Sequence, residues 1–342
     1  MQPYAIGIDV GGTKIAAGLV RRDGTILTRY NTHAHSEQQP EIVIAAIVQA
    51  YQAVIEQSRI DRAEVEAIGL GFGGNTNGPA GIILVSSNLP AWNNIPLRDI
   101  VAEQVGHRVI LDNDTNMGAL GEHRYGAGRN TQNMGYVTFS TGYGMGIIIN
   151  NRLYVGHAGT AGELGHVVID VGGPACTCGK DGCLMAYASG VGISRMVYDQ
   201  VRSGTKTLLR EMVPPDGKRV AGEVVAQAAK QGDEAARAII RQAGYYAGIG
   251  LSMIVQVLNP ELIVYGGGLT HIGPMIMEPV MAAMKEHSQP ELLDMVRVVP
   301  WQLGNDLGII GAAARVFAET EADQPGLLKA WRATQAEPRI LA

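Results

Sequence analysis

The sequence predicts an α/β protein with two lobes, and three observations lead to this prediction. The chain has 342 residues, which suits about two domains of roughly 150 residues each. Candidate strands alternate with candidate helices in two successive sets. Clusters of glycine and polar residues follow the strands, where ligands of such folds bind. We expect an N-terminal lobe at 1–118, a C-terminal lobe at 119–305, a final helix at 306–320 that packs back on the N-terminal lobe, and a tail at 321–342.

The N-terminal lobe begins with apolar segments rich in β-favouring residues. Asp23-Gly24 separates two of these segments and is a hairpin signal. A later segment places apolar side chains at helical spacing. The predicted elements are, in order, strands at 4–10, 15–20 and 25–30, a helix at 41–56, strands at 65–72 and 109–111, and a helix at 115–124.

The C-terminal lobe shows a second set of strands and helices. Eighteen of the 45 glycines lie between Gly118 and Gly192, so we expect a loop-rich centre flanked by regular structure. The predicted elements are a strand at 136–139, an irregular stretch at 152–190, a helix at 234–258, a strand at 262–265, a helix at 273–286, a strand at 296–299 and a helix at 307–319.

Composition and charge argue against several classes of protein. A hydrophobic content of 46% argues against wholesale disorder, and a net charge of −5 argues against a general nucleic-acid or membrane-surface binder. No apolar run reaches the ~18 residues of a membrane helix, and the first residues lack the pattern of a secretion signal. The three cysteines all lie between 176 and 183, which is not a disulfide framework. We therefore expect a cytoplasmic protein.

A glycine turn directly follows the first strand. Gly11 and Gly12 let backbone N–H groups approach an anion, while Thr13 adds a hydroxyl and Lys14 adds a positive charge. Asp9 is a candidate for holding Mg²⁺ through water. The spacing of a Walker A loop is missing. A phosphate-binding turn and a plain hairpin turn with a surface lysine are both open interpretations of these residues.

Two further glycine clusters follow strands of the C-terminal lobe. Hydroxyls and glycines at 140–146 (STGYGMG) come after the strand at 136–139, and three glycines come after the strand at 262–265. The candidate nucleotide-binding residues in these turns are Thr141, Gly142, Gly266, Gly267 and Gly268. Three such turns in two lobes suit a nucleotide held across a cleft better than three unrelated hairpins do.

An Asp-Asn-Asp segment lies where a strand ends and a helix begins. Asp114 is a candidate base that accepts a proton from an attacking hydroxyl group. The alternative is that Asp114 is only the N-cap of the helix, a common position for aspartate. Asn113 suits a sugar hydroxyl, because its amide both donates and accepts hydrogen bonds. Asn88 is a second such amide, although an isolated asparagine is more often a turn residue.

A cluster of sulfur and imidazole ligands lies in the irregular stretch. His166, Cys176, Cys178 and Cys183 form the pattern H-x₉-C-x-C-x₄-C, which satisfies tetrahedral Zn²⁺. Buried reduced cysteines are the alternative, but the whole cysteine content lies within eight loop residues. Four protein ligands leave no position for water, so we expect a structural zinc that fixes the loop carrying Glu163.

Four motifs together resemble a known family. Residues 9–14 (DVGGTK) resemble the first phosphate motif of the actin-like sugar kinase ATPase fold. Residues 111–122 (LDNDTNMGALGE), 162–166 (GELGH) and 176–183 (CTCGKDGC) resemble the ROK family (repressor, open reading frame, kinase). The resemblance extends over about residues 4–318. It implies the two-lobed actin-like ATPase, or ribonuclease H-like, fold with a central cleft, and an ATP-dependent sugar kinase.

The resemblance also implies roles for individual residues. Asp114 is the expected catalytic base for the sugar hydroxyl. The residues expected to hold the sugar are Asn88, Asn113, Glu163 and His166. Those expected to hold ATP and Mg²⁺ are Asp9, Gly12, Thr13, Thr141 and the turn at 266–268. Zinc is expected on His166 and the three cysteines, so that the second ring nitrogen of His166 faces a sugar hydroxyl.

Two positions depart from the family pattern. The cysteine motif of the family usually continues Cys-Leu-Glu, whereas this chain has Cys183-Leu184-Met185. A thioether does not accept a hydroxyl hydrogen bond as a carboxylate does, so Met185 weakens the expectation of strict glucose specificity. The second departure is Gly73, which stands where the family often has proline. Both changes lie in loops expected beside the sugar.

The leading hypothesis is a kinase that transfers phosphate from ATP to the primary hydroxyl of a hexose, with glucose first. Mannose, fructose, allose and N-acetylmannosamine are alternative acceptors, and a catalytically weak sugar-binding protein is an alternative function. A third is a sugar-responsive repressor, but the phosphate motif begins nine residues from the start and leaves no room for a DNA-binding domain. We expect no nucleic acid or membrane partner, and a homodimer or homotetramer.

Overall fold

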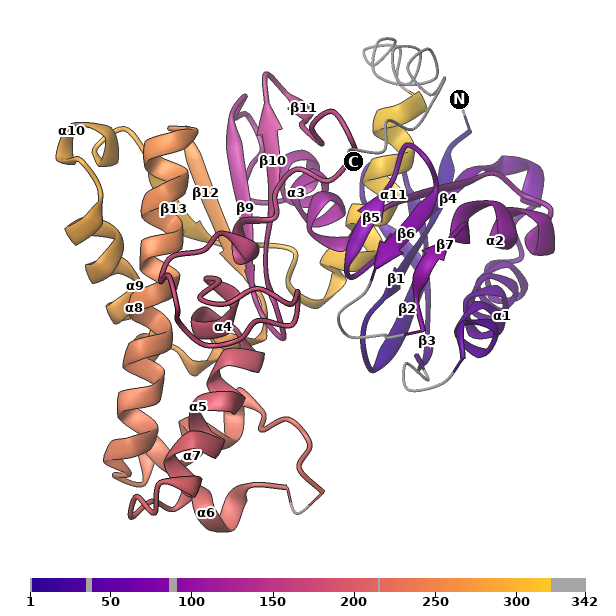
Figure 1. Ribbon diagram of the computed structural model, residues 1–342. Helices are drawn as coiled ribbons and strands as arrows, with labels where there is room; N and C mark the ends of the chain where they lie inside the picture. Colours follow the sequence, from indigo (N-terminus) through magenta and orange to yellow (C-terminus); the bar gives the residue numbers. More distant parts are fainter. Residues whose placement is uncertain (1, 35–38, 86–90, 215, 321–342) are drawn as a thin grey trace, which may run out of the picture.

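A computed structural model describes residues 2–34, 39–85, 91–214 and 216–320. Two α/β lobes lie side by side, each built on a five-stranded sheet (Figure 1). The fold class is therefore the predicted one. Asn88 and the tail at 321–342 lie outside the described residues.

The N-terminal sheet has the strand order β3-β2-β1-β4-β8. Its strands are β1 (Tyr4–Val10), β2 (Lys14–Arg21), β3 (Ile26–His33), β4 (Val65–Phe72) and β8 (Val109–Asn113). The first three strands form an antiparallel meander, and β4 and β8 run parallel to β1. The carboxyl ends of β1, β4 and β8 consequently meet at one edge of the sheet, where Val10 pairs with Phe72 and Phe72 pairs with Asn113.

Helices cover both faces of this sheet because side chains alternate along each strand. On β1, Ile6 and Ile8 belong to the core formed with α1 (Pro40–Ser58) and α2 (Leu97–Val105). Ala5 belongs to the core on the other face, which is formed with α11 (Leu307–Thr320). A small sheet of β5 (Asn75–Asn77), β6 (Ile82–Val85) and β7 (Asn93–Ile95) extends this lobe.

Glycines bring α11 directly onto the N-terminal sheet. A side chain on Gly7 would overlap the carbonyl oxygen of Ile309, and one on Gly69 would overlap that of Ala312. The last helix among the described residues therefore completes the lobe that β1 begins. It lies next to α3 (Asp114–Tyr125), and both helices stand between the two sheets (Figure 1).

The C-terminal sheet has the order β11-β10-β9-β12-β13. Its strands are β9 (Met134–Phe139), β10 (Tyr143–Ile149), β11 (Arg152–Leu153), β12 (Leu262–Gly266) and β13 (Arg297–Pro300). On one face lies α3, where Gly118 contacts the ring of Tyr136. The other face packs against a helical layer. Its helices are α4 (Met185–Ala188), α5 (Gly190–Arg202), α6 (Leu209–Met212), α7 (Gly222–Lys230), α8 (Glu234–Val257), α9 (Pro274–His287) and α10 (Pro290–Leu293).

The second glycine cluster differs from its prediction. Only 140–142 form the turn, and Gly144 and Gly146 lie inside β10, paired with β9. The reason is packing, because a side chain on Gly146 would overlap the backbone carbonyl of Thr115 in α3. These glycines therefore serve the close approach of a helix to the sheet rather than a turn.

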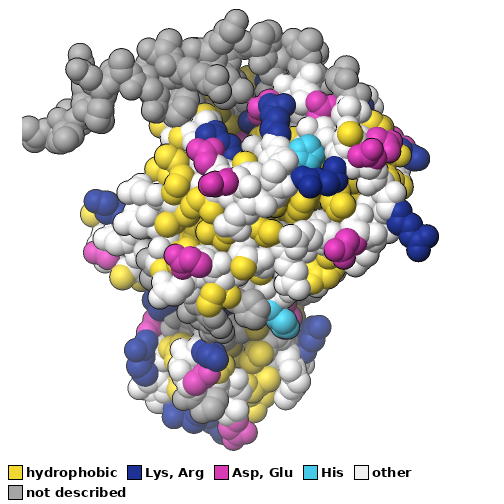
Figure 2. Space-filling model, turned by 90° about the vertical axis from the view of Figure 1, so that its right-hand side faces the viewer, with side chains coloured by type: hydrophobic (Ala, Val, Ile, Leu, Met, Phe, Trp, Pro, Cys, Tyr) yellow, Lys and Arg dark blue, Asp and Glu magenta, His cyan; other side chains and the backbone are white. Residues whose placement is uncertain are grey.

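No helix among the described residues is both long and apolar enough to cross a membrane. On the face of the N-terminal lobe shown in Figure 2, acidic and basic side chains are interspersed rather than gathered by sign.

Candidate functional site

The structure decides which residue caps α3. Asn113 has extended backbone angles, and its Oδ1 accepts a hydrogen bond from the N–H of Thr115 at 2.9 Å. Its Nδ2 donates to the carbonyl oxygen of Gly74 at 2.9 Å. Asn113 is thus the N-cap, and Asp114 is the first residue of the helix. The alternative that Asp114 serves only as an N-cap is wrong.

Asp114 is available for chemistry at the carboxyl end of β8. One carboxylate oxygen accepts from the N–H of Thr115 at 2.9 Å, and the other points toward Gly73, whose missing side chain leaves room beside it. Solvent reaches this carboxylate, yet surrounding protein removes enough water to raise the pKa of Asp114. A carboxyl group with a raised pKa is a stronger base than a free one.

Asp9 lies at the same edge of the sheet, at the end of β1. Burial and the negative charge of Asp114 raise the pKa of Asp9 to about 7, although Lys14 opposes the shift. A side chain at position 308 would overlap the Asp9 carboxylate, so Gly308 at the start of α11 makes room for it. Two carboxylates that repel one another suit a shared cation, and oxygen ligands of this kind fit Mg²⁺.

The first glycine turn, at 11–14, is a hairpin turn that also has accessible surface. The N–H of Gly11 donates to the carbonyl oxygen of Lys14 at 3.0 Å, so Gly11 shapes the turn between β1 and β2. A side chain on Gly12 would meet no atom within 4 Å. Beside the turn, the N–H of Ala34 donates to the carbonyl oxygen of Thr13 at 3.1 Å. The turn is therefore anchored on one side and accessible at Gly12.

The two glycine turns of the C-terminal lobe lie side by side. A side chain on Gly267 would overlap the carbonyl oxygen of Phe139, the residue that precedes the turn at 140–142. Gly267 has a φ of 96°, a conformation that glycine adopts readily. The start of α5 fixes the first of these turns, because the N–H of Val191 donates to the carbonyl oxygen of Thr141 at 3.2 Å. Gly268 opens onto free space.

The four candidate zinc ligands come together. The ligand atoms of His166, Cys176, Cys178 and Cys183 all lie within 4.8 Å of one another. The sulfurs of Cys178 and Cys183 are 3.7 Å apart, and Nδ1 of His166 lies 3.5 Å from the sulfur of Cys176. Ligands of tetrahedral zinc are separated by about 3.5–3.8 Å, given bond lengths of about 2.0–2.3 Å. The donor set and its spacing therefore fit Zn²⁺.

The segment at 166–183, which carries the four candidate zinc ligands and is called the zinc loop here, directly follows Glu163 and its neighbours. While Nδ1 of His166 faces the cysteines, its Nε2 lies 3.9 Å from a carboxylate oxygen of Glu163. Gly162 and Gly165 hold this segment against β10, where side chains would overlap carbonyl oxygens of the strand. Burial, followed by the charge of Asp114, raises the pKa of Glu163 to about 7. Carboxylates from both lobes thus influence one another.

Met185 is buried beside the zinc loop. It begins α4, is 6% exposed and packs in one cluster with Cys176 and Cys183. Its sulfur lies near the turn at Gly142, 3.9 Å from where a side chain would begin. The residue that departs from the expected pattern is therefore placed between the zinc loop and a glycine turn.

Comparisons with known proteins show the family of this chain. The family model described as "ROK family" matches residues 5–319. The chain belongs to the ROK family. Among ROK relatives, a glucokinase from Thermotoga maritima is 34% identical over 309 residues, which are 90% of this chain and 96% of the relative.

Solved ROK structures share the fold. A ROK glucokinase from Streptomyces griseus in complex with glucose and AMPPNP has a TM-score of 0.77 and 33% identity, covering 91% of this chain and 98% of its own. A ROK family transcriptional regulator, a homologue of the E. coli MLC protein, has a TM-score of 0.78 and 26% identity, covering 96% and 80%. The actin-like ATPase fold is confirmed, and within this family the same fold serves kinases and regulators.

The sequence did not predict the buried ion pair that supports residues 112–114, where β8 ends and α3 begins. Asp112 is 1% exposed and forms an ion pair with Arg315 of α11, with Nε and Oδ2 2.8 Å apart. The two residues are separated by 203 positions, so no local spacing links them. The sequence indicated only that Arg315 lies in the predicted helix at 307–319, and it did not identify the residue that Arg315 contacts.

Proposed function

We propose that this protein transfers the γ-phosphoryl group of ATP to the primary hydroxyl of a hexose, with glucose as the leading acceptor. Support comes from the glucokinase that is 34% identical and from the similar structure that holds glucose and AMPPNP. The single observation that carries the proposal is Asp114, which has a raised pKa and an accessible carboxylate. Its neighbour Asn113 fills the capping role instead.

Asp114 acts as the general base for the acceptor hydroxyl. It takes the hydroxyl proton while the hydroxyl oxygen forms a bond to the γ-phosphorus and the bond from that phosphorus to ADP breaks. The carboxylate oxygen that lies toward Gly73 is the proton acceptor in this proposal. Asn113 still has a donor hydrogen on Nδ2 for a sugar hydroxyl after its bond to Gly74.

The glycine turns hold the phosphates on the opposite side of the reacting group. Gly12, Thr13 and Lys14 approach them from the N-terminal lobe. Thr141, Gly142 and the turn at 266–268 approach from the C-terminal lobe. Asp9 suits the Mg²⁺ that accompanies ATP, and bound Mg²⁺ neutralises charge on the transferring group.

Glu163 and His166 form the sugar side of the proposed site. Nδ1 of His166 faces the cysteines and would hold zinc, which would fix the ring so that Nε2 and the Glu163 carboxylate face a ligand together. Asn88, by the family resemblance, completes the sugar contacts.

A coupled ADP-release assay over glucose, mannose, fructose, allose and N-acetylmannosamine tests the proposal. We expect glucose to give the highest kcat/KM, and Asp114→Asn to lower kcat by about 10²- to 10⁴-fold while sugar binding persists. Asp294→Asn, at an exposed position, is the matched control and should keep full activity. Undiminished activity of Asp114→Asn, or no ADP release with any sugar, would refute the proposal.

Met185 supports a second candidate function, a sugar-binding protein with weak catalysis. Its buried thioether occupies a position beside the zinc loop where the family pattern has a carboxylate. Calorimetry that detects sugar binding without ADP release would favour this alternative. If the leading proposal holds, Met185→Glu should raise the apparent glucose affinity and leave kcat unchanged.

We also propose that the protein assembles as a homodimer or homotetramer, as family members commonly do. Sedimentation velocity at micromolar concentration tests this proposal, and a monomer under those conditions would contradict it.

A further inference from the structure

Asp112 supports the segment that carries Asn113 and Asp114. Its Oδ1 accepts two hydrogen bonds, from the backbone N–H of Asn113 and from Nδ2 of Asn116, each at 2.8 Å. Both donors belong to the junction between β8 and α3. The orientation of the Asp112 carboxylate therefore sets the direction in which the chain leaves the strand.

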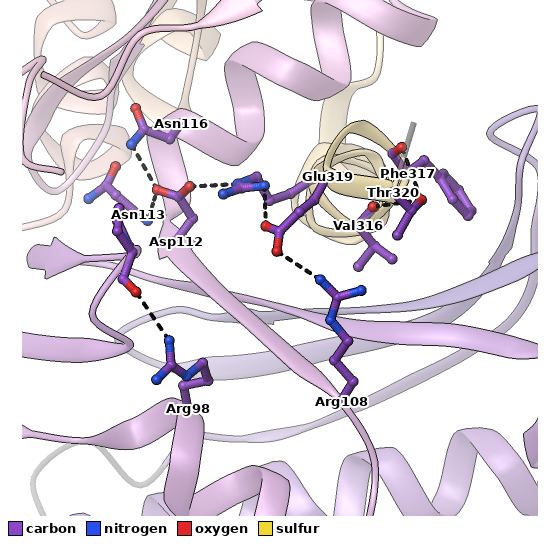
Figure 3. A network of polar contacts seen from close by, with 11 residues as sticks. Arg98, Arg108, Asp112, Asn113, Asn116, Val316, Phe317, Glu319 and Thr320 are labelled. Carbon is purple, nitrogen blue, oxygen red and sulfur yellow. Dashed lines mark hydrogen bonds and ion pairs between the residues drawn. The ribbon is translucent and has the colours of Figure 1, made fainter. Parts of the chain in front are cut away.

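Arg315 holds that carboxylate from the other side. Its Nε donates to Oδ2 of Asp112 at 2.8 Å, and its Nη1 donates to Glu319 at 2.8 Å. Glu319 in turn accepts from Nη2 of Arg108 at 2.8 Å (Figure 3). Asp112 is 1% exposed and the Arg315 side chain 13% exposed, whereas that of Arg108 is 51% exposed. The pair is thus the buried end of a network that begins at the surface.

Loss of the guanidinium group would change what Asp112 can do. A deeply buried carboxylate without its cation is strongly disfavoured, and Oδ2 of Asp112 would lose the charged donor that fixes it. The carboxylate would then turn toward other donors or water. Its Oδ1 would leave the position in which it accepts from the N–H of Asn113 and the amide of Asn116.

We propose that Arg315 is a positioning residue for phosphoryl transfer, acting through Asp112 on the backbone of Asn113 and Asp114. The inference rests on the proposed function, in which Asp114 is the base and Asn113 contacts the sugar. It places part of the alignment of the base on α11, far along the chain from the junction of β8 and α3 that carries the base. A displacement of about 1 Å at a reacting group is enough to cost ~10²-fold in rate.

A cavity beside this network provides a sharp test. It has a volume of about 380 Å³, and Arg98, Arg108, Arg315 and Glu319 are among the residues that line it. Truncation of Arg315 to alanine leaves the Asp112 carboxylate facing this space, with room for a small planar cation. Free guanidinium can then enter and replace the missing side-chain group, because it offers the same planar donors.

The experiment compares Arg315→Ala with Arg108→Ala, which removes only the exposed arginine of the network. We expect Arg315→Ala to lower kcat by about 10- to 100-fold with KM for ATP nearly unchanged. Millimolar guanidinium should restore much of the kcat, and equal concentrations of potassium or urea should not. Arg108→Ala should keep its kcat and show no response to guanidinium.

Two outcomes would overturn the proposal: a kcat of Arg315→Ala equal to that of the parent protein, or a loss of kcat that guanidinium does not reverse in a folded variant. If Arg315→Ala does not fold, Arg315→Lys takes its place. Lysine keeps the charge without the planar fork, so kcat should fall while KM for ATP persists, and full activity would refute the inference.

The proposal can also be separated from the proposed function itself. If the parent protein releases no ADP with any sugar, the proposed function fails, and glucose binding by calorimetry becomes the readout. Arg315→Ala should then weaken glucose binding by about 10-fold, because the Asn113 contact is displaced. Glucose affinity equal to that of the parent would overturn the positioning role.

Discussion

Asp9, Asp114 and Glu163 each hold a proton more tightly than a free carboxyl group does. The largest cause at all three is that surrounding protein displaces water from the carboxylate, although Asp114 and Glu163 keep exposed surface. Asp114 adds charge repulsion at the other two. Such a cluster is unfavourable in the protein alone and becomes favourable when a cation or a proton donor arrives. The three residues therefore distinguish the candidate functional site by their electrostatics as well as by their position.

The raised pKa of Asp9 predicts a pH-dependent stability in the absence of ligands. The folded protein binds a proton at Asp9 up to about pH 7, while the unfolded chain releases it near pH 4. The free energy of unfolding therefore falls as the pH rises from about 4 to 7. Asp9→Asn should remove the part of this fall that Asp9 causes, while the raised pKa of Glu163 maintains the rest. The melting temperature at pH 8 should rise by several degrees, since 1 kcal/mol corresponds to about 2–4 °C for a domain of 150–250 residues.

Differential scanning calorimetry between pH 5 and pH 8 checks this prediction. Asp294→Asn, at an exposed position, should follow the curve of the parent protein. An Asp9→Asn variant that is less stable than the parent at pH 8 would contradict it.

The residues of the candidate site were easier to predict from the sequence than the residues that support them, and their chemical roles stay predictions. Motif spacing is local, so Asp114 and the zinc ligands could be found from neighbouring residues. The N-cap alternative for Asp114 needed backbone angles, which show that Asn113 takes that role. The contact of Arg315 with Asp112 could not be predicted without the tertiary structure, because only the packing of α11 brings the two residues together.

At the scale of the elements, the zinc loop is held by isolated bridges and turns rather than by a long helix or strand. Its backbone is held by short turns, such as the bond from the N–H of Cys176 to the carbonyl oxygen of Lys180 at 2.8 Å. Gly182 has a φ of 72°, and a side chain there would overlap the carbonyl oxygen of Asp170. A metal ion is the natural source of further rigidity for such a loop.

Cys178→Ser tests this role of the loop. Cys178 is the exposed ligand, so its replacement disturbs packing less than replacement of the buried Cys176 or Cys183. We expect zinc content to fall and KM for the sugar to rise by about 10-fold or more, with KM for ATP unchanged. Elemental analysis by mass spectrometry and steady-state kinetics measure the two effects. Unchanged sugar KM in the zinc-free variant would separate the loop from the sugar site.

The predicted elements match the structure where the local sequence has a clear hydrophobic pattern. They differ where contacts between distant segments determine which residues are needed. The strand β4 (Val65–Phe72) matches its predicted bounds, and α8 (Glu234–Val257) differs by one residue. The strand β10 was missed because Gly144 and Gly146 were interpreted as part of a turn. Their conformation is extended, and the close approach of α3 is the reason for glycine there. Such a contact leaves no pattern in the local sequence.

At the scale of the whole molecule, one buried carboxylate joins the two connections between the lobes. Glu122 of α3 is 0% exposed. One of its oxygens accepts from the N–H groups of Gln302 and Leu303 at 2.9 Å, and the other accepts from Ala127 at 2.8 Å. The segment after α3 and the segment before α11 are therefore held together at one point.

Glu122→Gln should weaken this junction. An amide places its NH₂ group toward at least one backbone donor, and each lost bond in a buried position costs about 1–3 kcal/mol. We expect the free energy of unfolding, measured in urea, to fall by about 2–5 kcal/mol. Glu261→Gln is the matched control, because Glu261 also accepts from two backbone N–H groups, of Gln132 and Asn133, but is exposed. Equal losses in both variants would contradict the special role of Glu122.

The contact of α11 with Gly7 and Gly69 has a consequence for synthesis of the chain. A ribosome delivers the N-terminal strands first, yet the helix that covers one face of their sheet is among the last segments made. During translation this face, with Ala5 and Ala16, stays uncovered until Leu307–Thr320 has emerged. The C-terminal lobe is therefore complete in the nascent chain before the N-terminal lobe, and a chaperone that binds apolar strands has its longest opportunity on the part of the protein that was made first.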